Sequence, residues 1–210
     1  MSVEQALVEA SVRLEAEGLN AGTSGNVSVR VDGGLLVTPS AIPPSRLTAD
    51  ALVRLAMDGS VVSPGVPTSE WRIHRDIYAV RPDAGAIVHT HSTYATALAS
   101  LREDLPSFHY QVAKAGGPSI RCAPYATYGT QELSDNVATA LMDRRACLMS
   151  NHGMLALGSD LDAALALAIE VEVLCRQFLI ARAAGTPVLL SDEQMAQAAD
   201  KFSRYGLPEA

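Results

Sequence analysis

Histidines are the residues of this sequence whose type and spacing best fit metal binding. His89 and His91 flank Thr90 in the segment AIVHTHS, and His152 stands in the segment NHG. If 86–91 is a strand, residues two apart project from the same face about 6.6 Å apart, so both imidazoles can turn toward one ion. Two histidines can equally share a hydrogen-bonded surface, and His152 alone can be a turn or core residue. Three neutral imidazoles together would bind Zn²⁺ or another borderline divalent ion and leave a coordination position open for catalysis.

A carboxylate and a glycine-rich segment accompany the histidines. Glu70 follows Thr68 and Ser69 in the first turn of a predicted helix. It can be the acid or base beside an ion, or it can simply complement the helix dipole. The segment GTSGN at 22–26 offers unhindered N–H groups, hydroxyls and an amide, which suit a phosphate, and the helix N-terminus at 68–69 adds to them. A plain connection between a helix and a strand is the alternative for this segment.

Hydrophobic spacing predicts the elements that must position these residues. A first helix is expected between the Ser2–Gln5 cap and Gly18, and further helices at about 70–80, 92–101, 130–143, 160–184 and 191–203. Apolar runs predict strands at 27–31, 35–37, 86–88, 147–149 and 154–157. The first two strands form a hairpin, and Val61 and Val62 are expected to extend its sheet. No repeat or linker divides the chain, so we expect one domain over 1–210.

Composition limits the class of protein. Of the 210 residues, 48% are hydrophobic and 19% are charged, which favours a folded domain of mixed helices and sheet. The sequence has no run of eighteen apolar residues, so no membrane span is predicted. The formal net charge of −7 argues against nucleic acid or anionic lipid as partners. The N-terminus lacks a signal-peptide pattern, and the scattered Cys122, Cys147 and Cys175 fit buried thiols in a reducing cytoplasm.

Longer segments carry a resemblance that single residues cannot. Spread over nearly the whole chain, they are GTSGNVSVR, LLVTPSAIP, PTSEWRIHRDIY, RPDAGAIVHTHS, HYQVAKAGGPSIRCAPYATYGTQELS, NHGMLALG, EVEVLCR and KFSRYGL. Together they resemble the class II sugar-phosphate aldolases of the aldolase/adducin superfamily, and within it the fuculose-phosphate aldolases. The resemblance implies an α/β fold: a single three-layer α/β/α domain around a mainly antiparallel sheet. It also implies a cytoplasmic homotetramer with its sites at subunit interfaces.

The same resemblance assigns roles to individual residues. His89, His91 and His152 would ligate Zn²⁺, or another divalent ion such as Mn²⁺ or Co²⁺. Glu70 would be both a further ligand and the catalytic base. Tyr110 would be the acid and would reach the site from a neighbouring subunit.

A second group of residues would contact the substrate. The phosphate pocket implied by the resemblance is lined by Thr23, Gly25, Asn26, Ser40, Ala41, Thr68 and Ser69. Tyr205, in the C-terminal segment KFSRYGL, resembles a residue that closes over the substrate. The chain departs from the family at Ala41, where glycine is common. If the backbone there must adopt a positive φ or approach the phosphate, the methyl group affects pocket size and phosphate affinity.

The implied activity is reversible cleavage of a ketose 1-phosphate, such as L-fuculose 1-phosphate, to dihydroxyacetone phosphate and a short aldehyde. Glu70, displaced from the ion by substrate, would take a proton in the condensation direction. Zinc would stabilise the resulting enediolate, and Tyr110 would protonate the aldehyde oxygen. This chemistry needs no lysine Schiff base.

Other members of the superfamily provide the alternatives. Sugar-phosphate 4-epimerases, a dehydratase and decarboxylases reuse a metal-stabilised enolate, although the epimerases typically carry Asp at the position of Glu70. Adducin-type head domains are non-enzymatic interaction modules. His74 is expected at the surface or in packing, and His109 as a support for Tyr110. Glu170 and Glu172 are expected on a packing and solvated helix face.

Overall fold

Seven strands form one sheet in the computed structural model, which describes residues 1–204. They are β1 (Asn26–Val31), β2 (Gly34–Val37), β3 (Val53–Ala56), β4 (Ala86–Thr90), β5 (Cys122–Ala123), β6 (Ala146–Met149) and β7 (Gly153–Gly158). Their order across the sheet is β3-β2-β1-β4-β7-β6-β5. Neighbours are antiparallel except β5 and β6, which are parallel. The expected mainly antiparallel sheet is confirmed.

Helices occur where the apolar spacing predicts them. They are α1 (Val3–Ala16), α2 (Trp71–Val80), α3 (Thr93–Ala99), α4 (Gln131–Ala140), α5 (Leu161–Ala184) and α6 (Asp192–Ser203), with short 3-10 helices at Pro44–Arg46, Ala49–Ala51 and Tyr110–Ala115. The predicted capping boxes at Ser2 and Ser191 both form. None of the helices in the described part of the chain is long and apolar enough to cross a membrane.

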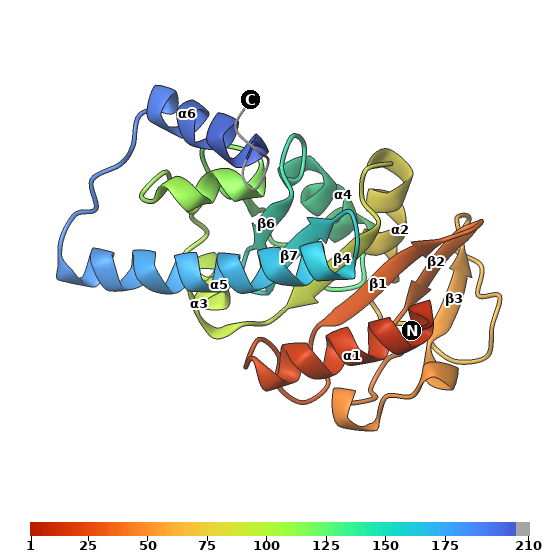
Figure 1. The fold of residues 1–210 in the computed structure, drawn as a ribbon. Helices are drawn as coiled ribbons and strands as arrows, with labels where there is room; N and C mark the ends of the chain where they lie inside the picture. Colours follow the sequence, from red (N-terminus) through yellow and green to blue (C-terminus); the bar gives the residue numbers. More distant parts are fainter. Residues whose placement is uncertain (205–210) are drawn as a thin grey trace.

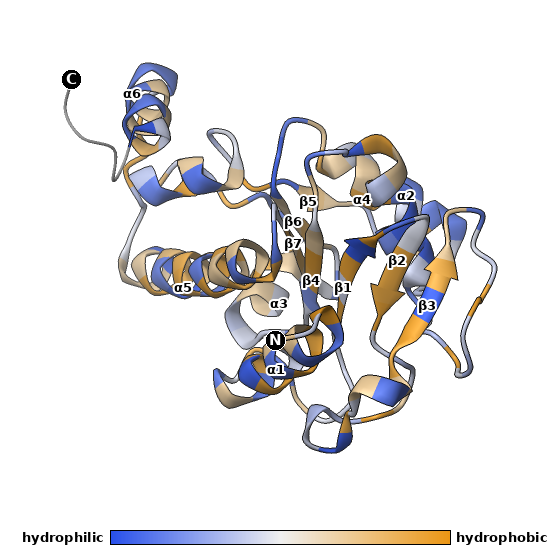
Figure 2. Ribbon diagram, turned by 45° about the vertical axis from the view of Figure 1, so that its right-hand side comes forward, coloured by the Kyte–Doolittle hydropathy of each residue, from blue (hydrophilic) through white to orange (hydrophobic). Residues whose placement is uncertain are grey.

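Two helical layers cover the two faces of the sheet (Figure 1, Figure 2). Helices α1, α3 and α5 pack on one face, while α2 and α4 pack on the other. Side chains alternate between the layers along β4: Ala86 and Val88 join the α1–α5 side, and Ile87 joins the α2–α4 side. The predicted three-layer α/β/α arrangement is confirmed, and this alternation decides which layer His89 faces.

One edge of the sheet differs from the expectation. The residues around Val61 and Val62 form no strand, and Val61 makes only an isolated bridge with Leu55. The strand that extends the hairpin is β3, which pairs with β2. Val61 and Val62 are exposed, whereas Val53 and Leu55 of β3 are buried. A pair of β-branched residues therefore does not by itself predict a strand; the strand forms where side chains pack into the core.

The cysteines match their prediction. All three thiols are free; Cys147 and Cys175 are buried and Cys122 is partly buried. Burial raises the pKa of the Cys122, Cys147 and Cys175 thiols, so they stay protonated and unreactive.

Candidate metal centre and the adjoining cavity

Strand β4 lies in the middle of the sheet and carries the first histidine. His89 is buried, and its position two residues after Ile87 directs its ring toward the α2 layer. His91 follows one residue beyond the end of β4 and is exposed. Thr90 bonds instead to Ser92, with its Oγ1 3.3 Å from the Ser92 Oγ. The expectation that His89 and His91 turn to one side is met, and their Nε2 atoms lie 3.0 Å apart.

The turn between β6 and β7 brings the third histidine. His152 follows Asn151, whose φ is 53°, and precedes Gly153. A Cβ on Gly153 would lie 2.2 Å from the carbonyl oxygen of Thr90, so only glycine lets β7 begin this close to β4. The ring of His152 lies 5.0 Å from that of His89 and 4.9 Å from that of His91, centroid to centroid. The rings of His89 and His91 are 4.9 Å apart, so the three imidazoles form a nearly equilateral triangle.

Glu70 completes the cluster from the start of α2. It is the N-cap residue, immediately before the first residue of the helix, and not a member of the first turn as expected. Its side chain is buried, with Oε2 3.0 Å from Nε2 of His89 and Oε1 3.2 Å from Nε2 of His152. The side-chain amide of Asn26, on β1, donates to Oε2 at 3.1 Å.

The donor atoms of this cluster fit a divalent cation. His89 Nδ1 bonds to the Met154 carbonyl oxygen at 2.9 Å, which keeps the proton of the neutral ring on Nδ1 and leaves Nε2 as the nitrogen that can give its lone pair to a metal ion. Glu70 Oε1 is buried and accepts no hydrogen bond from any described residue. One ligand atom from each of Glu70, His89, His91 and His152 lies within 4.8 Å of the others. Lone pairs that face one another in this way need a cation between them.

Protonation of the cluster follows from the same contacts. Burial favours the neutral Glu70 carboxyl, but the charge and hydrogen bond of His89 hold the pKa of Glu70 well below its usual range. Burial lowers the pKa values of His91 and His152 to about 4, aided by the positive charge of His89. The carboxylate and these two neutral imidazoles are in the forms that bind metal ions.

A cavity of about 470 Å³ opens beside the cluster. All of the predicted pocket residues within the described chain line it: Thr23, Gly25, Asn26, Ser40, Ala41, Thr68 and Ser69. Gly25 has a φ of 73°, a left-handed conformation that favours glycine, and a Cβ there would also displace the side-chain amide of Asn20, whose nitrogen would lie 2.3 Å away. Ala41 also has a positive φ, 60°, which is costly for a residue with a Cβ.

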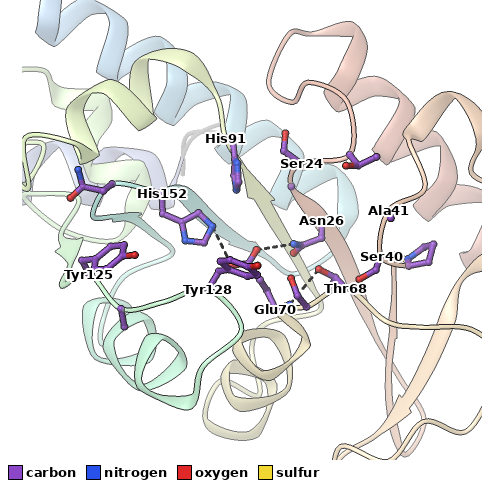
Figure 3. A pocket seen from close by; sticks show the side chains of 16 residues that line it. Ser24, Asn26, Ser40, Ala41, Thr68, Glu70, His91, Tyr125, Tyr128 and His152 are labelled. Atoms are coloured by element: carbon purple, nitrogen blue, oxygen red, sulfur yellow. Dashed lines mark hydrogen bonds and ion pairs between the residues drawn. The ribbon is translucent and has the colours of Figure 1, made fainter.

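The opposite wall of the cavity contains residues that sequence reasoning missed. Tyr125, Ala126, Tyr128 and Asn151 line it, and Figure 3 shows Tyr125 on the side away from Ser40 and Ala41. The two tyrosines are exposed although they are large and aromatic. Two aromatic residues in the short segment PYATYGT, just before the N-cap of α4, were the available signal.

Two predicted site residues are not brought to the cluster by this chain. Tyr110 begins the 3-10 helix Tyr110–Ala115, is half exposed, and stacks on Phe202 of α6 with 5.8 Å between ring centroids. It is not among the residues that line the cavity. Tyr205 lies outside the described residues.

Comparisons with known proteins agree on one family. The family profile described as "Class II Aldolase and Adducin N-terminal domain" matches residues 5–179. The chain is 46% identical over 202 residues to an "L-fuculose phosphate aldolase" of Escherichia coli K12, covering 96% of this chain and 94% of the relative. It is 44% identical over 206 residues to a "5-methylthioribulose-1-phosphate/5-deoxyribulose-1-phosphate aldolase" of Rhodospirillum rubrum, covering 98% and 93%. A solved structure named "L-fuculose 1-phosphate aldolase" matches with a TM-score of 0.93 and 42% identity over 96% of each chain.

Proposed function

This chain belongs to the class II aldolase and adducin family, as a lyase of the fuculose-phosphate aldolase type, and we propose that it is a zinc enzyme acting on an L-fuculose 1-phosphate-like ketose 1-phosphate. Cleavage between carbons 3 and 4 would release dihydroxyacetone phosphate and a short aldehyde. The observation that carries the proposal is the meeting of His89, His91, His152 and Glu70 at the edge of a polar cavity.

A 5-deoxypentulose 1-phosphate is the second candidate substrate. The relative from Rhodospirillum rubrum, at 44% identity, is named for 5-methylthioribulose 1-phosphate and 5-deoxyribulose 1-phosphate. These compounds share the ketone and the 1-phosphate with fuculose 1-phosphate and differ in the part that becomes the aldehyde. The cavity wall carrying Tyr125 is the described surface opposite the proposed phosphate loop, so we propose that it contacts the aldehyde part.

The phosphate would be held without a basic side chain. No lysine or arginine lines the cavity in the described part of the chain. Hydroxyl groups of Thr23, Ser40, Thr68 and Ser69, the turn at Gly25, and the start of α2 are available to bind an anion. Backbone N–H groups and a helix N-terminus bind phosphate well because the helix dipole adds to their hydrogen bonds.

The ion would be held by Nε2 of the three histidines and by Glu70. When bound, a Zn²⁺ ion withdraws electron density from the substrate ketone as a Lewis acid. Glu70 moves the proton at carbon 3: it removes this proton in condensation and returns it in cleavage. Asn26 occupies Oε2, and Oε1 accepts no hydrogen bond from a described residue, so Oε1 is the oxygen free to act as the base.

The proton on the carbon 4 oxygen requires a second group. We propose Tyr110 of a neighbouring subunit for this transfer, within a homotetramer. In one chain its half-exposed ring lies outside the cavity, as expected for a side chain that acts on another subunit's site. Tyr205 as a residue that closes over substrate, and a cytoplasmic location for an enzyme with three free thiols, are parts of the same proposal.

Enzymatic release of dihydroxyacetone phosphate tests the proposal. The protein is dialysed against a chelator and assayed with and without added Zn²⁺, using a reductase that oxidises NADH as dihydroxyacetone phosphate appears. L-Fuculose 1-phosphate, 5-deoxyribulose 1-phosphate and 5-methylthioribulose 1-phosphate are compared with ribulose 5-phosphate. We expect Zn²⁺-dependent cleavage of a ketose 1-phosphate. Epimerisation of ribulose 5-phosphate, or no cleavage of any of the three ketose 1-phosphates, would contradict the proposal.

A further inference from the structure

A chain of buried hydrogen bonds leads from the core to Glu70. The Tyr78 hydroxyl lies 2.9 Å from Ser28 Oγ, and Ser28 Oγ lies 2.7 Å from Nδ1 of His74. His74 Nε2 lies 2.5 Å from Oδ1 of Asn26, whose Nδ2 donates to Glu70 Oε2. All five side chains are buried, so His74 is not at the surface; it is fully enclosed and engaged at both ring nitrogens.

Two periodicities place these side chains in one row. Glu70, His74 and Tyr78 are four residues apart and therefore share one face of α2 and its N-cap. Asn26 and Ser28 are two residues apart and share the face of β1 that is turned toward this helix. The row is thus built into the packing of α2 on the sheet.

The donor and acceptor in each hydrogen bond of the row follow from the residue at its end, Glu70. An ionised Glu70 only accepts, so Asn26 must present its amide nitrogen there and its oxygen to His74. His74 must then donate from Nε2. A neutral ring with its proton on Nε2 accepts at Nδ1, so the hydroxyl of Ser28 donates to it and accepts in turn from Tyr78.

The neutral form of His74 follows from its surroundings. Burial, together with the positive charge of His89, lowers the pKa of His74 to about 3. His74 does not line the cavity, so it does not touch the space available to substrate. Among the described residues, the contact that links His74 to Glu70 is the side chain of Asn26.

We propose that His74 is a positioning residue: its Nε2–H holds the Asn26 amide so that Nδ2, and not Oδ1, faces Glu70. This role rests on the proposed aldolase function, because it fixes Oε2 of Glu70 and leaves Oε1 for the ion and the substrate proton. Without this donor, the Asn26 oxygen would be buried and unpaired, which is unfavourable. The amide would then be held at one end only, so Oε2 of Glu70 would lose its firmly placed donor.

Variants of His74 separate positioning from packing. His74→Phe keeps a buried ring but has no donor, whereas His74→Gln can offer an amide N–H near the position of Nε2. We expect His74→Phe to lower kcat on the order of 10–100-fold, with KM little changed, and to weaken Zn²⁺ binding about tenfold, as for other groups that orient a ligand. We expect His74→Gln to recover most of both losses.

A matched control removes a different buried hydrogen bond to α2. Ser134 is buried on α4, and its hydroxyl donates to Asp76 of α2 at 2.7 Å, outside the row. Ser134→Ala is therefore expected to lower the melting temperature without changing kcat or Zn²⁺ affinity. Equal losses of kcat in Ser134→Ala and His74→Phe would show that His74 contributes only to stability, and would overturn the proposal.

A double variant tests the route through Asn26. If His74 acts through this amide, His74→Phe combined with Asn26→Ala should bind Zn²⁺ no more weakly than Asn26→Ala alone. If the two substitutions instead reduce Zn²⁺ affinity by factors that multiply, the route through Asn26 is refuted. Zn²⁺ affinity is measured by competition with a chromophoric chelator on substrate-free protein, so this arm is decided even if no ketose 1-phosphate is cleaved.

The unaltered protein provides a test that does not depend on a variant folding. Nitrogen-15 NMR of labelled histidine distinguishes the two neutral ring tautomers. We expect His74 to carry its proton on Nε2 in the Zn²⁺-loaded protein and to stay neutral down to pH 5. A proton on Nδ1 alone would leave Nε2 as an acceptor and require the Asn26 amide to be turned, and this result would overturn the proposal.

Discussion

Replacing Glu70 by glutamine separates its proposed roles as metal ligand and as general base, because the hydrogen bonds of the site determine how the glutamine side chain is oriented. Asn26 Nδ2 needs an acceptor, so the new side chain must place its oxygen where Oε2 lies now. Its NH₂ group then occupies the position of Oε1, 3.2 Å from Nε2 of His152, and can donate to that bare nitrogen. Glu70→Gln should therefore fold normally and melt within a few degrees of the parent.

The loss of activity should be far larger than any loss of stability. An amide cannot take or return the proton at carbon 3, and removing a positioned general base costs on the order of 10²–10⁴-fold in turnover. At about 1.36 kcal/mol for each factor of ten, the barrier rises by about 3–5 kcal/mol. Zn²⁺ affinity should also fall, because a neutral NH₂ group replaces a carboxylate oxygen of Glu70 among the ligands.

The assay must distinguish slower chemistry from weaker Zn²⁺ binding. Dihydroxyacetone phosphate release is measured at Zn²⁺ concentrations that saturate Glu70→Gln, so that a weaker site does not count as slower chemistry. Glu103→Gln is the matched control, since Glu103 pairs only with exposed Arg182 among the described residues. We expect this control to keep full activity. Turnover of Glu70→Gln within about threefold of the parent at saturating Zn²⁺ would falsify the general-base role, given the 10²–10⁴-fold effect of such a base.

Three further changes have defined outcomes. His91→Ala should lose metal and activity together, measured as metal content after gel filtration, because two imidazoles and a carboxylate form a poorer site; retention of a full equivalent of metal would contradict this. Ala41→Gly removes the strain of a Cβ at a φ of 60°, which stabilises the fold by about 1–2 kcal/mol, and it makes the unfolded chain more flexible, which destabilises the fold by about 0.4–1 kcal/mol. The melting temperature should therefore be unchanged or higher, and a clear fall would show that no strain is stored at Ala41. Burial raises the pKa of Asp76, but hydrogen bonds from Gln131, Ser134 and Arg75 hold it below the usual range. Its stabilisation is therefore present above pH 4 and lost as the pH falls through the lowered folded value. Urea unfolding should show Asp76→Asn about 1–3 kcal/mol less stable at pH 7, and this difference should shrink as the pH is lowered below 4; a constant difference would refute the ionic origin.

Sequence patterns predicted the elements because their signals are local. The capping boxes at Ser2 and Ser191 and the apolar spacing of the helices depend on residues three to four apart. The H-x-H pair at 89 and 91 likewise shares one face because strand geometry alone requires it. That His152 joins the pair depends on how β7 lies against β4, and no local pattern specifies such a contact; the resemblance to a family supplied it.

What the sequence could not supply is the partner of each polar side chain. His74 was expected at the surface or in packing because its neighbours in sequence do not reveal Ser28 and Asn26 across the helix–sheet interface. Glu172 was expected on a packing and solvated face, yet its carboxylate accepts the backbone N–H groups at the start of α3. Both contacts join residues far apart in the chain, so they are visible only once the layers are assembled.

Sheet register connects the fold to the chemistry. Asn26 of β1 stands directly opposite His89 of β4, and His89 stands opposite Leu155 of β7. A slip of one residue between β1 and β4 would turn Asn26 to the other face, away from Glu70, because side chains alternate along a strand. The site therefore depends on the same apolar alternation that sorts the core into two layers: Val27 and Val29 enter one layer, which leaves Asn26 and the hydroxyl of Ser28 on the side of α2. The residues that hold Glu70 are in place because their apolar neighbours are buried on the opposite face.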